Sequence, residues 1–275
     1  MRIRPARQDD LRTIMAWARD EGWNPGVGDD RLFLPADPGG FLVAERDGRM
    51  VGSISMVRHG PRYAFCGLFI VRPVLRGGAT GARLALAALE LAGDRVVGTD
   101  GVLEHADDYA RLGFVRAHSH HRYSGVVTGA ADPAVLDVAD VDVDQLLTLD
   151  DQCFPGDRRE FMRAWLAPPH VTRVSVDASG VPDGFGVARE AVDGWRVGPL
   201  IAPDGRRAEA VVRSLAAEVP GQVLHVDINT GNPAAVDMAQ RMGLEPGFAC
   251  VRMYKGGIPD LPLHRMFAAG TLELG

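Results

Sequence analysis

The part of the sequence best suited to bind a ligand is a glycine-rich turn between an apolar segment and a helix-forming segment. The apolar residues 65–71 are halted at Pro73, the turn covers 76–81, and residues 82–92 are almost all apolar. The backbone amides of such a turn, together with the unpaired amides of a helix start, form a cradle for phosphate. Glycines keep side chains out of that cradle, and Arg76 adds a positive charge. The turn therefore predicts a phosphate site, although it matches neither the mononucleotide nor the dinucleotide motif.

Three other side chains could carry acid–base chemistry. Tyr109, in the segment Tyr-Ala-Arg-Leu-Gly-Phe, has a phenol that could donate a proton; alternatively, its ring only fills space at a helix end. Asp100 ends a predicted strand and Glu21 follows the first helix, and each carries a carboxylate. Alternatively, Asp100 caps the turn at Gly101, and Glu21 is a solvated carboxylate.

Two further clusters favour structural explanations, and we expect no metal. The three cysteines are far apart, which argues against a disulfide framework and a thiolate metal site. The histidines of residues 118–121 lie in a predicted strand and point to alternate faces, which predicts a solvated edge rather than a zinc site. The acidic run 140–144 is typical of a helix start and lacks the glycine of a calcium loop.

Composition limits the class of protein. The chain has 275 residues, of which 46% are apolar and 24% charged, enough for two domains of roughly 130 residues each. A net charge of −6 argues against nucleic-acid binding. The first residues form no apolar signal segment, and no run approaches the roughly 18 apolar residues that span a bilayer. We expect a cytoplasmic protein without membrane or nucleic-acid partners.

Periodicity and turn residues predict an alternation of strands and helices that occurs twice. The first set has strands at 2–4, 41–44, 50–57, 65–71, 95–99 and 114–123, and helices at 9–18, 82–92 and 107–112. A linker is predicted over 126–138. The second set has strands at 172–176, 184–189, 195–202 and 223–228, and helices at 140–149, 208–218 and 233–242.

The repeat is supported by spacing. Gly113 precedes Arg122 by nine positions, and Gly243 precedes Arg252 by nine. Residues 96–100 also match 223–227, and residues 67–71 match 198–202, in the same order. Three matches in one order predict a duplicated α/β fold.

These motifs resemble those of the GNAT superfamily of N-acetyltransferases. Arg76, Ala79 and Gly81 occupy the defined positions of its pyrophosphate motif, and Tyr109 to Phe114 is similar to its Y-x-x-x-G-F signature. The resemblance implies acetyl-CoA as the co-substrate. It places the coenzyme on Phe69, Ile70, Val71, Arg76, Gly77, Gly78, Ala79, Thr80 and Gly81. The Asn and Ala that usually precede the tyrosine are replaced here by Val102 and His105.

The resemblance extends to a tandem subgroup with a C-terminal acetyltransferase-like domain. It is carried by 21–26, 37–41, 99–102, 252–256 and 272–275. It implies an α/β (α+β) protein of two GNAT-like domains, 1–127 and 134–275, each a mixed, mostly antiparallel sheet flanked by helices. In the second domain Ala239 replaces the tyrosine, and the turn over 202–208 has one glycine and an acidic residue. We therefore expect the coenzyme site in the first domain only.

The resemblance implies transfer of an acetyl group to a primary amine by direct attack in a ternary complex. Tyr109 would act as the acid and Asp100 or Glu21 as the base, while Trp23 and Asn24 would line the acceptor pocket. Direct attack needs no covalent enzyme intermediate, so Cys66 in its strand would be inert. The alternative function is an acyl-CoA-binding sensor without turnover. The resemblance leaves open whether the acceptor is a small-molecule amine or a protein amine. It also leaves open whether the protein is a monomer or a homodimer.

Overall fold

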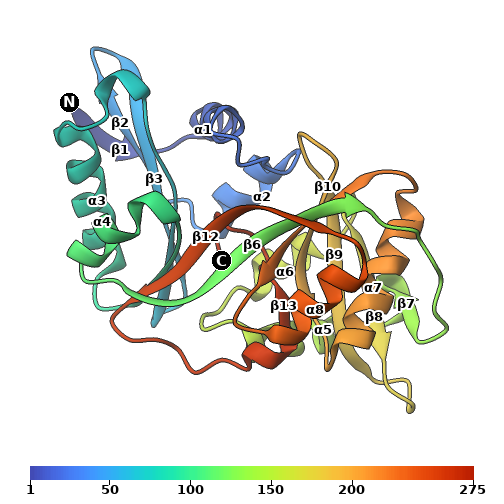
Figure 1. The fold of residues 1–275 in the computed structure, drawn as a ribbon. Helices are drawn as coiled ribbons and strands as arrows, with labels where there is room; N and C mark the ends of the chain where they lie inside the picture. The colour runs from blue at the N-terminus through green and yellow to red at the C-terminus, as the bar shows by residue number, and fades with distance from the viewer.

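The computed structural model describes residues 1–275 and joins all of its strands into one sheet (Figure 1). The sheet has 13 strands in the order β1-β2-β3-β4-β5-β12-β6-β11-β13-β10-β9-β8-β7. Only the pairs β4–β5 and β10–β11 are parallel. The fold is therefore a mixed, mostly antiparallel α/β architecture, as the sequence predicts.

The elements up to the linker form the first half. Its strands are β1 (Arg2–Pro5), β2 (Phe41–Arg46), β3 (Arg49–His59), β4 (Tyr63–Val71), β5 (Val96–Val102) and β6 (Val115–Val126). Its helices are α1 (Gln8–Asp20), α2 (Asp29–Ala36), α3 (Ala79–Ala92) and α4 (Ala106–Arg111).

The remaining elements form the second half. Its strands are β7 (Val135–Asp137), β8 (Val171–Val176), β9 (Pro182–Glu190), β10 (Trp195–Ile201), β11 (Val223–Asn229), β12 (Glu245–Lys255) and β13 (Met266–Ala268). Its helices are α5 (Val143–Cys153), α6 (Arg159–Trp165), α7 (Gly205–Glu218) and α8 (Pro233–Arg241).

The two halves exchange their last long strands. β12 of the second half lies between β5 and β6 of the first half, and β6 continues into the second half by pairing with β11. In Figure 1 both strands cross the middle of the molecule side by side. The domain boundaries at 127 and 134 stay a prediction, and each half uses a strand of the other to complete its sheet.

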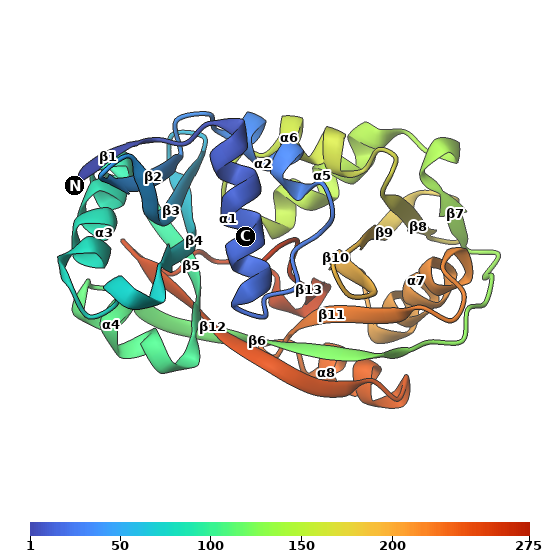
Figure 2. The same ribbon diagram turned by 90° about the horizontal axis from the view of Figure 1, so that it is seen from above.

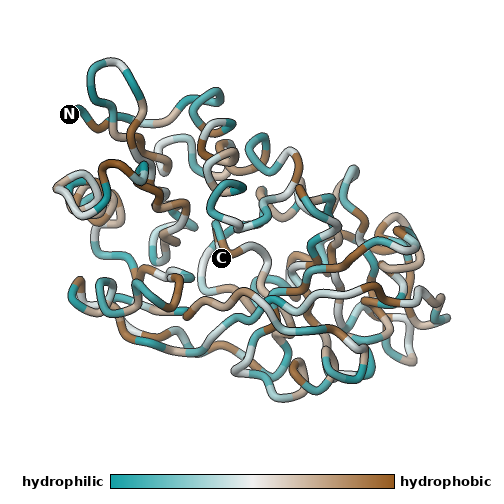
Figure 3. Tube along the Cα trace, turned by 45° about the horizontal axis from the view of Figure 1, so that its top comes forward, coloured by the Kyte–Doolittle hydropathy of each residue, from teal (hydrophilic) through white to brown (hydrophobic).

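The helices cover both faces of this curved sheet. α1, α2, α5 and α6 lie together inside the curve, where residues of both halves form one shared apolar core (Figure 2). α3 and α4 pack on the outer face of the first half, and α7 and α8 on that of the second. The helices alternate between hydrophobic and hydrophilic residues, as expected when one face is buried (Figure 3). No helix combines the length and apolar character needed to cross a membrane.

The structure differs from the sequence analysis in three places. Helices α2 and α6 are absent from the predicted elements, because short helices that end near proline or glycine give a weak periodic signal. The almost wholly apolar segment 82–92 predicts a buried helix, but α3 is not fully buried, since Leu86 is 58% exposed. The histidines of β6 do not lie on a solvated edge, because β6 is paired on both sides. The acidic run does begin a helix, with Asp142 accepting a hydrogen bond at the start of α5.

Candidate functional site

The glycine-rich turn presents five consecutive backbone amides without a partner. After the 3-10 turn at Pro73–Leu75, Gly77 adopts a left-handed conformation (φ +74°) and Gly78 is the extended N-cap of α3. No backbone or side-chain acceptor receives a hydrogen bond from the amides of residues 77–81. An anion with several oxygen atoms would satisfy these donors at the positive end of the helix.

Arg76 is placed at this turn but is bound to other groups of the protein. Its Nε donates to the Val71 carbonyl at 2.9 Å, and its Nη2 forms an ion pair with the Glu21 carboxylate. The Arg76 side chain is 48% exposed, so this pair is accessible to solvent and to ligands. The structure thus places Glu21 beside Arg76 of the glycine-rich turn rather than beside Asp100.

Next to the turn, β4 and β5 separate into a fork. Their pairing runs from Tyr63↔Val96 to Cys66↔Thr99 and then stops, although both strands continue. A bulge at Leu68, with φ +45°, bends β4 away, and the Ser53 hydroxyl donates to the Leu68 carbonyl at 2.9 Å. Phe69, Ile70 and Val71, the predicted pantetheine contacts, follow this bulge. They lie on the strand edge that faces the opening of the fork.

A small apolar cavity adjoins the fork on the side of α3 and α4. Its walls include Cys66 and Phe69 of β4, Ala88 of α3, and Tyr109. The first turn of α3 lies over this strand, because a Cβ on Gly81 would meet the Phe69 ring at 3.5 Å. The glycine-rich turn and the apolar cavity therefore both adjoin Phe69 of β4.

Tyr109 lies at the point where the fork begins to open. Its ring packs across Gly101 and meets the Phe114 ring edge-on, with centroids 5.7 Å apart. Burial raises the pKa of the phenol, and the Thr99 hydroxyl beside it offsets part of that rise. The phenol is therefore protonated at neutral pH, as a proton donor must be. The neighbouring Cys66 is buried, and burial raises the pKa of its thiol to about 12, so it stays an unreactive thiol.

The second half has the same two features, and both are filled by the chain itself. Asp204 caps α7, and its carboxylate accepts from the amides of Arg206 and Arg207, both at 2.9 Å. The fork between β10 and β11 opens after Val197↔Val226 and is occupied by β13, which pairs with both strands. Only the first half combines free amides with a fork between whose strands no third strand is paired, although the C-terminal backbone at Glu273 lies against Gly67 at the fork vertex.

Asp100, the first β5 residue beyond the fork vertex, is a fully buried member of an ion pair. Both of its oxygens accept from Arg252 of the exchanged strand β12, at 2.7 and 2.6 Å, and Oδ1 also contacts His120 Nδ1 at 3.0 Å. Burial alone would raise the pKa of Asp100, but the charge of Arg252 and the hydrogen bonds from Arg252 and His120 outweigh it and lower that pKa below its usual range. Asp100 is ionised and fully hydrogen-bonded.

An equivalent pair occurs in the second half. Asp227 of β11 binds Arg122 of the exchanged strand β6 at 2.8 and 3.2 Å. These residues are the repeat partners of Asp100 and Arg252. The duplication is thus visible in the contacts: each half supplies the arginine that neutralises the buried aspartate of the other.

Asp100, His120 and Cys250 also place potential metal ligands within 4.8 Å of one another. The Arg252 guanidinium already binds both oxygens of Asp100, so a metal cation would lie against a fixed positive charge. The observed contacts are those of an ion pair. That the protein needs no metal stays a prediction.

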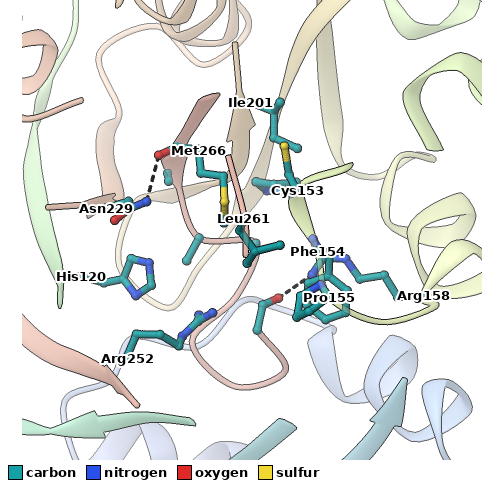
Figure 4. A pocket seen from close by; sticks show the side chains of 15 residues that line it. His120, Cys153, Phe154, Pro155, Arg158, Ile201, Asn229, Arg252, Leu261 and Met266 are labelled. Carbon is teal, nitrogen blue, oxygen red and sulfur yellow. Dashed lines mark hydrogen bonds between the residues drawn. The ribbon is translucent and has the colours of Figure 1, made fainter. Parts of the chain in front are cut away.

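A second cavity lies between the two halves (Figure 4). Its polar walls are His120, Asn229, Arg252 and Arg158. Asp150 binds both Nε and Nη2 of Arg158 at 2.8 Å, so the charges of both arginines are balanced within the protein. The rest of the lining is largely apolar, including Phe154, Leu261 and Met266. The cavity suits a small, mostly apolar molecule.

The residues predicted for the acceptor pocket lie where the two halves meet. The Asn24 side chain bonds both the carbonyl and the amide of Asp193 at 2.8 Å, and the Trp23 carbonyl accepts from Arg122 at 2.9 Å. These contacts connect the loop after α1 to the second half. Neither residue lines the cavity of Figure 4.

Sequence reasoning missed His120 and Arg252 as site residues. Both lie on exchanged strands, so their proximity to Asp100 depends on pairing between segments that are distant in sequence. The conserved spacing from glycine to arginine in both halves was a signal for Arg252. This spacing marks the arginine whose side chain binds the buried aspartate of the other half.

Comparison with protein families agrees with this architecture. The description "Acetyltransferase (GNAT) family" matches residues 8–118, and "Acetyltransferase (GNAT) domain" matches residues 146–268. A holothin acyltransferase from a Pseudoalteromonas strain is 27% identical over 99% of this chain and 94% of its own length.

Solved structures show the same fold. A putative acetyltransferase from Pyrococcus horikoshii superposes with a TM-score of 0.85 at 19% identity, covering 100% of this chain and 95% of its own. A tandem GNAT protein from the clavulanic acid biosynthesis pathway gives a TM-score of 0.61 at 16% identity, covering 94% and 99%. The chain described here is a tandem GNAT protein and an acyltransferase, with one GNAT domain in each half.

Proposed function

We propose that the first half transfers an acetyl group from acetyl-CoA to a primary amine, by direct attack while both substrates are bound. The observation that carries this proposal is the contrast between the two halves. In the first half, five amides are free beside an unfilled fork; in the second, the Asp204 carboxylate and β13 occupy the corresponding places. We also propose 1–127 and 134–275 as the domain limits.

Each part of the first site has a chemical task in this proposal. The amides of Gly77, Gly78, Ala79, Thr80 and Gly81 would hold the diphosphate, and Arg76 would add its charge on release from Glu21. The edge of β4 at Phe69, Ile70 and Val71 would receive the pantetheine arm. Holding the thioester beside the amine supplies much of the rate acceleration.

Tyr109 would protonate the departing thiolate, since its phenol is protonated and lies at the fork vertex. Asp100 is the carboxylate proposed for the acceptor side. It is ionised but engaged at both oxygens, so it would act through the groups bound to it. Glu21, the other carboxylate predicted as a base, is paired with Arg76 and would control the charge available there. Trp23 and Asn24 remain the residues proposed to bind the acceptor.

The cavity between the halves favours a small-molecule amine over a protein amine. It is bounded by segments of both halves, whereas a peptide acceptor needs an open groove. The relative named as a holothin acyltransferase supports acyl transfer as the reaction class.

Calorimetry with acetyl-CoA and a thiol-release assay with a panel of small primary amines test the proposal. We expect saturable binding of one acetyl-CoA per chain, and CoA release that depends on the amine. A lysine-containing peptide serves as the comparison acceptor. Binding without amine-dependent release would identify a sensor, and the absence of any binding would rule out the coenzyme site.

A further inference from the structure

We propose that His120 is the base that removes the proton of the acceptor amine, and that Asp100 is its positioning residue. The inference rests on the proposed acetyl transfer and names the group that completes it. It is drawn from the contacts of the His120 imidazole, its position beside the fork and the asymmetry between the two halves.

The hydrogen bond to Asp100 fixes which nitrogen of His120 can accept a proton. Nδ1 lies 3.0 Å from Oδ1 of Asp100, an ionised carboxylate that only accepts hydrogen bonds. The proton of the neutral ring must therefore reside on Nδ1, which leaves the lone pair on Nε2. No protein group bonds Nε2, and the ring lines the cavity between the halves (Figure 4).

The sheet register brings this imidazole to the fork. Asp100 directly follows Thr99, the last β5 residue paired with β4. His120 lies in the same row as Cys250 of β12, and Cys250 in the same row as Val102 at the end of β5. β12 lies between β5 and β6, and the contact between the Asp100 carboxylate and the ring bridges that strand, so His120 is connected to the fork through Asp100.

The second half lacks this arrangement. Cys250 follows Gly243 by seven positions, as His120 follows Gly113, so a cysteine occupies the equivalent position. Asp227 instead binds a second arginine, Arg196, at 2.6 Å. The half with the filled fork therefore has only permanent cations at its buried aspartate. The half with the open fork has an imidazole that can take up a proton.

The other groups that face His120 do not replace it as a base. The His118 ring lies edge-on with centroids 5.1 Å apart, and burial, His120 and Arg252 lower the pKa of His118 to about 3. Cys250 is buried and directs its sulfur to the His120 carbonyl, and burial raises the pKa of its thiol. Arg252 is a permanent cation.

In the resulting step the amine nitrogen forms a bond to the thioester carbon and the carbon–sulfur bond breaks. The amine proton passes to His120 Nε2, and the sulfur receives the Tyr109 proton. Return of the proton from His120 to the tyrosinate through solvent leaves an amide and free CoA thiol, with no net change in the enzyme. Asp100 stabilises the imidazolium while it carries the proton.

Thiol release from acetyl-CoA with phenethylamine as acceptor tests the assignment, because the cavity is mostly apolar. We expect His120→Gln to lower kcat by about 100-fold or more, with acetyl-CoA affinity unchanged by calorimetry. His121→Gln is the matched control, since the next residue of β6 points to the opposite face; it should keep full activity. A kcat for His120→Gln within threefold of the unmodified protein would overturn the proposal.

Two further measurements separate a chemical from a structural effect. Added imidazole should raise the activity of His120→Gly at least tenfold. A variant that is merely misfolded would show no such increase. Nitrogen-15 NMR of the unmodified protein should find His120 with Nδ1 protonated and Nε2 unprotonated; a proton on Nε2 of the neutral ring would refute the assignment. If the unmodified protein binds acetyl-CoA but acetylates no amine, the proposed function itself fails, independently of His120.

Discussion

At the scale of single residues, the site combines a buried phenol with buried charges that balance one another. Tyr109 is held by ring contacts with Gly101 and Phe114 rather than by its hydroxyl alone. Asp100 and Asp227 each carry a bidentate arginine from the other half. Position is therefore fixed by packing for Tyr109 and by ion pairing for the aspartates, and the effects of substitution differ accordingly.

Tyr109→Phe should lower kcat by about 100-fold, because the proton donor for the leaving thiolate is lost while the ring contacts persist. Acetyl-CoA affinity should stay within about twofold, since the amides of the turn are untouched. Steady-state kinetics and calorimetry on the same preparation measure both quantities. An unchanged kcat would remove Tyr109 from the mechanism.

Two buried histidines predict sensitivity to mild acid. Burial and the Arg158 charge lower the pKa of His59 to about 3, and His118 has a similar value. An unfolded histidine has a pKa of about 6.5, so between these values the unfolded state binds more protons. The free energy of unfolding should therefore fall as the pH drops below about 6.5, by roughly 1.4 kcal/mol per pH unit for each histidine.

Urea denaturation between pH 7 and pH 5 measures this slope. His118→Leu should reduce it by the contribution of one histidine, because His59, His170 and His225, whose pKa values are also lowered by burial, remain, whereas His105→Leu, at an exposed position, should leave it unchanged. Equal slopes for all three proteins would show that the buried histidines do not control acid stability.

At the scale of elements, the two glycine-bearing turns differ by one carboxylate. Gly78 and Asp204 occupy the N-cap of corresponding helices, and both have extended backbones. A Cβ on Gly78 would meet only the Leu75 carbonyl, at 3.5 Å, so an aspartate fits there. The turn before α3 is open to an external anion, whereas the turn before α7 carries the Asp204 carboxylate.

Gly78→Asp should make the turn before α3 resemble the turn before α7, which carries its own carboxylate. The new carboxylate would cap α3 and raise the free energy of unfolding by about 0.5–1 kcal/mol, while it repels the diphosphate and lowers acetyl-CoA affinity by about 100-fold or more. Gly78→Ala is the control and should bind more tightly than the aspartate variant. A more stable Gly78→Asp protein that binds as well as the original would show that the diphosphate lies elsewhere.

At the scale of the whole molecule, strand exchange joins two GNAT domains into a single sheet and one shared inner core. Neither half retains its full set of strand neighbours without the other. The two domains should therefore unfold together rather than as independent units.

Asp227→Asn tests this coupling from the second half. Loss of the buried charge leaves Arg122 and Arg196 less compensated and should lower the free energy of unfolding by about 3–5 kcal/mol. Scanning calorimetry should still show one transition, shifted to lower temperature as a whole. Two separate transitions, with that of the first half unmoved, would contradict a single cooperative unit.

The sequence by itself determined the local elements and the glycine-rich turn. Apolar periodicity defined the strands and long helices, glycine positions defined the turn, and equal spacings revealed the duplication, because these signals lie within short segments. The short helices α2 and α6 were missed for lack of such a signal.

Only the tertiary structure decided which half is open and which side chains surround Asp100. The filling of the second fork by β13, the exchange of β6 and β12, and the contact between Asp100 and His120 all join residues far apart in the chain. Hydrogen bonding between strands is nearly independent of side-chain identity, so the sequence of a strand does not specify its neighbour. The packing shared by both halves determines which strands pair.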